Sequence, residues 1–118
     1  MIKVIQLIRR KAGWSFDDFK DYYENHHSKL IRTAPLAIRY RRRYLTPFVD
    51  PFHPQDERAS YDVMTEVWFA DQASMEETFF NQDPANVRLI VEDEAHFMDR
   101  AASLLYTIED VETPLARA

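Results

Sequence analysis

The order of strand-like and helix-like segments along the chain constrains its fold more than any other feature. Strand-like segments, rich in β-branched residues or alternating apolar and polar positions, occupy residues 2–10, 36–45, 61–70 and 103–109. Helical spacing occupies about residues 15–32 and 71–98, and Pro84 breaks or restarts the second helix. The resulting β-α-β-β-α-β order predicts an α+β protein with a ferredoxin-like fold, in which a four-stranded antiparallel sheet carries both helices on one face.

The 118 residues fit a single domain. Residues 46–60 contain three prolines and are predicted to form a loop, and residues 110–118 form a C-terminal tail. Helices on one face leave the other sheet face uncovered. We therefore expect a homodimer that packs sheet against sheet.

Composition narrows the possible functions. The chain has no cysteine, which is compatible with a reducing cytoplasm and excludes thiolate chemistry, and Gly13 is its only glycine, which excludes glycine-rich nucleotide-binding loops. The net charge of −5 argues against a nucleic-acid partner. The chain has neither an apolar run of about 18 residues, as a membrane span requires, nor the features of a signal peptide. We therefore expect a cytoplasmic protein without a membrane anchor.

The stretch YYENHHSKL, residues 22–30, is the first candidate site. Phe16, Phe19, Tyr23, His26 and Leu30 form a helical stripe. His26 and His27 then lie about 50° to either side of the buried direction, where an imidazole can be tuned to exchange protons near neutral pH. The alternative is a structural pair near a helix end. Adjacent helical residues diverge by about 100°, so the pair is a poor metal site and no metal is expected.

The segment YDVMTEVWFA, residues 61–70, has two different faces. Its odd positions are mostly apolar and should pack on the helices, whereas its even positions, Asp62, Met64, Glu66 and Trp68, should point to the uncovered side. A carboxylate beside a large aromatic ring suits a pocket, in which Glu66 could act as an acid or base. The alternative is that Glu66 pairs with an arginine across the dimer. Residues 92–94, Glu-Asp-Glu, are expected to be a solvated face.

Tyrosines on the second strand are further candidates. Tyr40 and Tyr44 alternate with arginines, and either hydroxyl could orient a phenol or donate a hydrogen bond to an oxyanion. Packing within the sheet is the alternative role for both.

In these motifs the chain resembles the EthD-domain family of the dimeric α+β barrel superfamily, from about residue 2 to residue 109. Phe19 to His27 resembles the first-helix motif of that family, with His27 at its histidine position. The family usually has proline where this chain has Lys29. Other matching positions are Tyr40, the strand residues Asp62, Glu66, Trp68 and Phe69, and the segment 95–103.

The resemblance implies a homodimer with a ligand cavity, and related proteins act on aromatic or carbonyl compounds mostly without a cofactor. We therefore expect a cofactor-independent lyase-type enzyme, a decarboxylase, dehydratase or cyclase, acting on a small aromatic or carbonyl-bearing metabolite such as a polyketide. His27 would be the general base or acid, Tyr40 a hydrogen-bond donor and Glu66 the partner acid. The residues expected to bind the substrate are Tyr23, His26, Asp62, Met64 and Trp68. A monooxygenase of a related barrel, with or without haem, and a non-catalytic dimeric binder are the alternatives.

Overall fold

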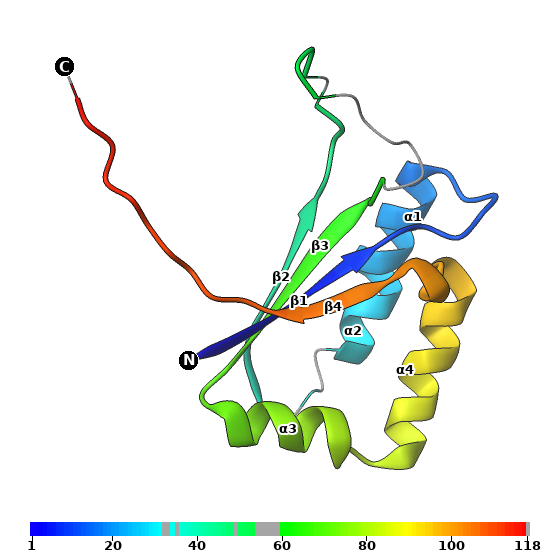
Figure 1. The fold of residues 1–118 in the computed structure, drawn as a ribbon. Helices are drawn as coiled ribbons and strands as arrows, with labels where there is room; N and C mark the ends of the chain where they lie inside the picture. Colours follow the sequence, from blue (N-terminus) through cyan, green and yellow to red (C-terminus); the bar gives the residue numbers. More distant parts are fainter. Residues whose placement is uncertain (32–33, 35, 49, 54–59, 118) are drawn as a thin grey trace.

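The computed structural model describes residues 1–31, 34, 36–48, 50–53 and 60–117. Much of the expected loop 46–60 and the last residue of the tail therefore lie outside the described residues. The described tail residues from 108 onward are extended and lead away from the body of the domain (Figure 1).

One four-stranded antiparallel sheet organises the molecule (Figure 1). Its strands stand in the spatial order β2-β3-β1-β4. Their bounds are β1 Ile2–Ile8, β2 Ala37–Tyr44, β3 Val63–Phe69 and β4 Leu104–Thr107. The two strands at the centre are the most β-branched segments of the chain, as expected for strands buried between neighbours. The order and the antiparallel pairing confirm the predicted ferredoxin-like fold.

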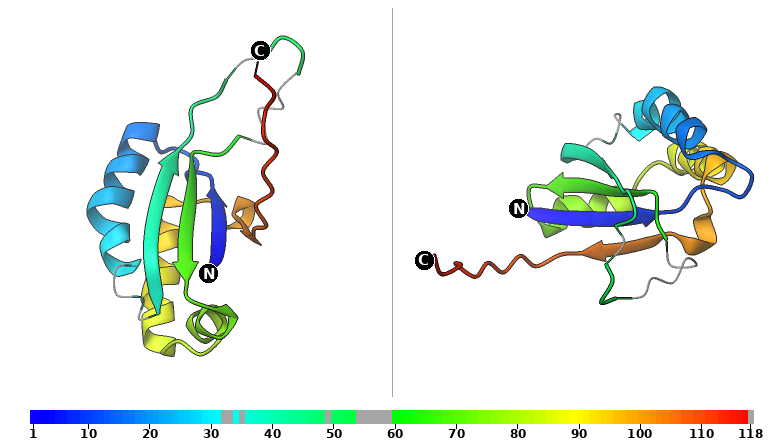
Figure 2. Two further views of the ribbon diagram at one scale, coloured as in Figure 1. Left: turned by 90° about the vertical axis from the view of Figure 1, so that its left-hand side faces the viewer. Right: turned by 90° about the horizontal axis from the view of Figure 1, so that it is seen from above.

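The helices cover one face of this sheet and leave the other face open (Figure 2). A continuous helical segment consists of α1 Phe16–Tyr22, the π-helical turn η1 Tyr23–His27 and α2 Ser28–Ile31. The second half of the chain contributes α3 Gln72–Phe80, α4 Pro84–Phe97 and the short 3₁₀ helix η3 Arg100–Ala102. In Figure 1, α1 and α4 lie behind the sheet, whereas α3 crosses its lower end.

Side-chain caps fix where the helices begin. Serine is a favoured N-cap residue, and the Oγ of Ser15 caps the first helix by accepting a hydrogen bond from the backbone N–H of Asp18 at 3.0 Å. Ser74 and Glu77 have the spacing of a capping box, but α3 begins earlier, because Asp71 is its cap and accepts from the Ser74 N–H at 2.7 Å. Asp83 caps α4 directly before Pro84, a residue that needs no N–H at the first helical position.

The π-helical turn corrects the expected buried stripe of the first helix. In a regular α-helix every fourth residue drifts by about 40° around the axis. A π turn has more residues per turn and offsets that drift. Phe19, Tyr23 and His27 are therefore all buried at intervals of four residues, whereas the His26 side chain, expected in the stripe, is 58% exposed.

The buried side chains form two clusters on the helical side of the sheet. The larger one centres on aromatic rings of the first helix and α4, and comprises Ile8, Phe19, Tyr23, Val63, Phe97 and Met98. The smaller one joins the other end of the sheet to α3 and comprises Val4, Phe69 and Met75. The candidate site lies between these two clusters.

Candidate active site

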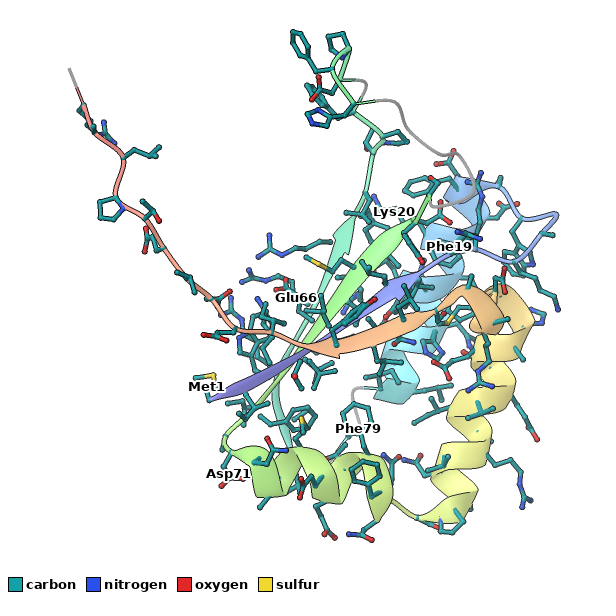
Figure 3. All side chains as sticks on the ribbon, in the orientation of Figure 1. Met1, Phe19, Lys20, Glu66, Asp71 and Phe79 are labelled. Atoms are coloured by element: carbon teal, nitrogen blue, oxygen red, sulfur yellow. The ribbon has the colours of Figure 1, made fainter. Side chains whose placement is uncertain are left out.

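A cavity of about 350 Å³ lies between the inner face of the sheet and the helices. Its walls are mostly apolar and come from all four strands, the first helix, α3 and α4. Phe79, for example, extends from α3 toward the sheet (Figure 3). The polar side chains on the wall are Gln6, Tyr23, His27, Tyr40, Thr65, Thr78, Gln82, Glu94, Arg100 and Ser103. Apolar walls with a limited set of polar groups are typical of small-molecule sites, and the volume falls in their usual range of roughly 300–1,000 Å³.

His27 and Asp93 form a hydrogen-bonded pair on this wall. The Nδ1 atom of His27 lies 2.7 Å from Oδ2 of Asp93, and His27 is only 2% exposed. A carboxylate at this distance accepts the Nδ1–H, so the neutral imidazole carries its lone pair on Nε2. Within the described chain, no hydrogen bond is made to Nε2. This nitrogen is therefore not bound to another group of the described chain.

Asp93 stays ionised because several donors surround it. The Tyr22 hydroxyl donates to its Oδ1 at 2.5 Å, and Nδ1 of His26 lies 3.2 Å from the same oxygen. Burial alone would raise the pKa of Asp93, but the hydrogen bonds from Tyr22 and His27 and the charges of both histidines outweigh it and hold the pKa below its ordinary value. The carboxylate can thus orient His27 and stabilise its protonated form. His26, which also stacks on Tyr22, acts on Asp93 from outside the cavity.

A chain of three hydroxyl groups occupies the sheet side of the cavity. The Tyr23 hydroxyl lies 2.7 Å from the hydroxyl of Tyr40 and 2.7 Å from Oγ1 of Thr65. The three hydroxyl groups share only two mutual bonds, so one of their three protons remains available to a ligand. Burial is the main reason that the pKa of Tyr23 rises to about 12 and that of Tyr40 rises further. These hydroxyls are therefore hydrogen-bond donors at neutral pH and not bases.

Glu94 is the one carboxyl group on the described cavity wall. Its side chain is 14% exposed, and its Oε1 lies 3.6 Å from Nε of Arg100. Burial raises the pKa of Glu94 above its ordinary value, against the opposing charges of His27 and Arg100. Sequence reasoning placed both Asp93 and Glu94 on a solvated face, which is wrong.

Five residues expected at the site do not border the cavity, and His26 is one of them. Met64, Glu66 and Trp68 lie on the outer sheet face, and Figure 3 shows Glu66 on the side away from the helices. Asp62 precedes β3 and accepts a hydrogen bond from the Arg10 backbone N–H at 2.7 Å. The expected alternation of β3 is correct, but the enclosed space lies behind its odd-numbered face, at Thr65, Val67 and Phe69.

Glu66 is paired within its own chain. It is 1% exposed, accepts a hydrogen bond from Nε of Arg43, and lies 2.5 Å from Nζ of Lys3. Burial would raise its pKa, but the two cations outweigh burial and lower it. Trp68 shares Lys3 with Glu66, and its ring lies 5.0 Å from Nζ of Lys3 and 4.9 Å from the Arg39 guanidinium. Glu66 therefore pairs with an arginine of its own chain, and not with one across a dimer as the alternative expected.

The structure therefore brings Tyr23, His27 and Tyr40 together around one cavity. In the described residues no group of three or more His, Asp or Glu side chains is arranged to hold a metal ion. No helix among those residues is long and apolar enough to cross a membrane.

The comparisons with known proteins agree with this fold. The sequence matches the EthD domain over residues 11–101, and the chain belongs to the EthD-domain family. No curated protein matches it in sequence. A solved EthD-family protein from Bacillus halodurans is 16% identical, with a TM-score of 0.67 over 94% of this chain and 100% of that one.

Two other solved structures share the fold. A dimeric ferredoxin-like protein of unknown function from Thermobifida fusca is 15% identical, with a TM-score of 0.61 over 91% of this chain and 88% of that one. An antibiotic biosynthesis monooxygenase is 21% identical, with a TM-score of 0.53 over 95% of this chain and 100% of that one. At these identities the likeness extends to the fold alone.

Proposed function

We propose that the protein is a cofactor-independent lyase-type enzyme that removes a proton from carbon beside the carbonyl group of a small, largely apolar metabolite. The observation that carries this proposal is the His27–Asp93 pair, which leaves Nε2 of His27 unbonded, on the wall of a cavity that the Tyr23–Tyr40–Thr65 hydroxyl chain also lines. A base and an oxyanion donor on one apolar wall are the two groups that enolate formation needs.

The roles of the residues follow from their geometry. His27 accepts the carbon-bound proton at Nε2, and Asp93 stabilises the imidazolium that forms. The hydroxyl chain uses its free O–H to donate a hydrogen bond to the carbonyl oxygen as that oxygen becomes negative. A carbonyl group already makes the neighbouring C–H acidic, so the step requires no further electron sink. From the enolate, loss of a β-hydroxyl group gives dehydration, and attack on a second carbonyl group gives ring closure. Decarboxylation of a β-keto acid reaches the same enolate through loss of carbon dioxide in place of a proton, and the same hydroxyl chain stabilises it.

Deuterium exchange tests this proposal without knowledge of the natural substrate. Phenylacetone is a small aryl ketone with acidic protons beside its carbonyl group, and ¹H NMR in D₂O follows their loss. We expect the protein to accelerate this exchange and to lose the acceleration when phenylacetone is displaced by a larger apolar ligand. Binding of phenylacetone without exchange would instead indicate a binding protein, and would overturn the enzymatic proposal.

Tyr40→Phe tests the oxyanion donor. The substitution removes the Tyr40 hydroxyl, which the proposal takes as the group that donates to the carbonyl oxygen, and leaves the bond between Tyr23 and Thr65 in place. We expect the exchange rate at saturating ketone to fall about 10²-fold, because loss of one oxyanion donor costs roughly 10²–10³ in rate. The dissociation constant for phenylacetone should change little. An equal loss in binding and rate would assign Tyr40 to ground-state binding only.

The same proposal includes a homodimer. Leu104 and Tyr106 of β4 are exposed on the open sheet face, and exposed apolar groups on a sheet face usually meet another surface. The Thermobifida fusca protein of the same fold is described as dimeric. This face suits a second copy of the chain, since a symmetric dimer covers both open sheets at once.

Sedimentation velocity tests the dimer. We expect the chain to sediment as a dimer and Tyr106→Glu to weaken association by at least about tenfold, because the substitution places a charge in an apolar contact. Phe80→Glu is the matched control, since Phe80 is exposed on α3, away from the open face. A monomeric native protein, or equal effects of the two variants, would contradict the assignment of this face.

A further inference from the structure

We propose that Glu94 is a general acid that works together with the His27–Asp93 pair, and that the site therefore acts on β-hydroxy ketones and releases water from them. This inference rests on the proposed function, because it requires His27 to remove the proton. It replaces Glu66, which lies on the other side of the sheet, as the second acid–base residue.

The position of Glu94 on α4 directs it into the cavity. Cavity-lining residues of α4 and the residue after it recur at helical spacing: Val87, Ile90, Val91, Glu94 and Met98. Glu94 is the one polar member of this otherwise apolar stripe. The neighbouring Asp93 turns toward the first helix instead, where it bonds to Tyr22 and His27. The two adjacent carboxyl groups thus lie in different environments: Glu94 borders the cavity, and Asp93 bonds to the first helix.

Charged and polar groups from each neighbouring element face Glu94. His27 and Tyr23 act on it from η1, Arg100 from η3 and Gln6 from β1, while Asp93 precedes it on α4. Burial raises the pKa of Glu94, whereas that of Asp93 is lowered. Two carboxyl groups whose pKa values are moved apart are typical of an acid and a base assignment at one site. The protonated form of Glu94 is the one that donates.

The elimination balances in atoms and charge. His27 Nε2 takes the proton from the carbon beside the carbonyl, and that electron pair forms the new C=C bond. The C–O bond at the next carbon breaks, and the hydroxyl group leaves as water with the proton of Glu94. His27 is then protonated and Glu94 ionised, and exchange with solvent restores both. No oxidant, reductant or metal takes part.

Glu94→Gln tests the proposal with 4-hydroxy-4-phenylbutan-2-one. Loss of water from this compound gives a conjugated aryl enone, which ultraviolet absorbance follows. We expect the native protein to accelerate the elimination and Glu94→Gln to slow it at least about 10²-fold, the usual lower value for a general acid. Glu92→Gln, at an exposed position on the same helix, is the matched control. An equal rate for Glu94→Gln and the native protein would overturn the assignment.

A second substrate with a different leaving group distinguishes the loss of a general acid from a loss of folded structure. In 4-(4-nitrophenoxy)butan-2-one the departing nitrophenoxide is a stable anion that needs no proton, whereas departing hydroxide does. The ratio of hydroxy-ketone to nitrophenoxy-ketone rates should therefore fall about 10²-fold in Glu94→Gln. A parallel loss with both compounds would indicate a structural role and would also overturn the assignment.

The pH profile gives a further readout. Because the protonated carboxyl is the donor, the rate with the hydroxy ketone should decline as pH rises through the elevated pKa of Glu94. This alkaline decline should be absent with the nitrophenoxy ketone and absent in Glu94→Gln. The native protein could eliminate nitrophenoxide while Glu94→Gln has no effect on the loss of hydroxide. That result would leave the proposed function standing and would remove Glu94 from it. A native protein inert toward both ketones and toward exchange would remove both proposals.

Discussion

His27→Gln should reduce the exchange of phenylacetone protons by about 10²–10⁴-fold, the contribution of a single positioned base. Glutamine approximates the size of the imidazole and can still donate to Asp93, so the buried pocket beside Phe97 stays filled. It has no lone pair basic enough to accept a proton from carbon. The effect should therefore appear in the rate at saturating ketone and not in the binding of the ketone.

His26→Gln is the matched control for this substitution. The two histidines are adjacent and both have Nδ1 near Asp93, but the His26 ring is largely exposed and does not border the cavity. We expect the exchange rate of His26→Gln to stay within about threefold of native, a small fraction of the effect of losing a base. Exchange that survives in His27→Gln but is lost in His26→Gln would reverse the assignment. Exchange that is equal in all three proteins would refute it.

Phe97→Ala should cause the largest loss of stability of any single truncation in the site region. Phe97 is completely buried and its ring packs against Phe19, Tyr22, Tyr23 and His27. Truncation of a buried phenylalanine leaves a cavity and costs about 3–5 kcal/mol in the free energy of unfolding. Native proteins of this size have only about 5–15 kcal/mol in total.

Urea denaturation followed by circular dichroism measures this effect. Phe80→Ala is the control, because that side chain is 77% exposed and its loss should change the free energy of unfolding by less than about 0.5 kcal/mol. Phe97→Leu should fall between the two, since it retains part of the apolar volume. A loss below about 1 kcal/mol for Phe97→Ala would show that the aromatic cluster around His27 is not the core of the domain.

The fold could be predicted from the sequence because each element has a clear periodicity and its ends carry recognisable caps. Ser15, Pro84 and the alternation of β3 each give local information that survives in the folded chain. Strand order and pairing then follow from the connection rules for such units. The π-helical turn was not predictable in this way, because its geometry depends on packing against α4 and not on local preference.

The site was only partly predictable. Tyr23, His27 and Tyr40 were recognised, because a helical stripe and a strand tyrosine can be read locally. Glu66 was misplaced, because its alternation with apolar neighbours is equally compatible with an ion pair on the open sheet face. Glu94 had a usable signal: it continues the apolar stripe of α4, a position that a solvated glutamate would not normally occupy. Asp93 had no such signal, since it faces another helix.

The His27–Asp93 hydrogen bond joins residues that are 66 positions apart along the chain. The carboxylate that orients the imidazole is synthesised with α4, well after His27 itself. The same helix supplies Phe97 to the core and several residues to the cavity wall. The arrival of α4 during synthesis would therefore complete the core, the cavity and the proposed base in one step.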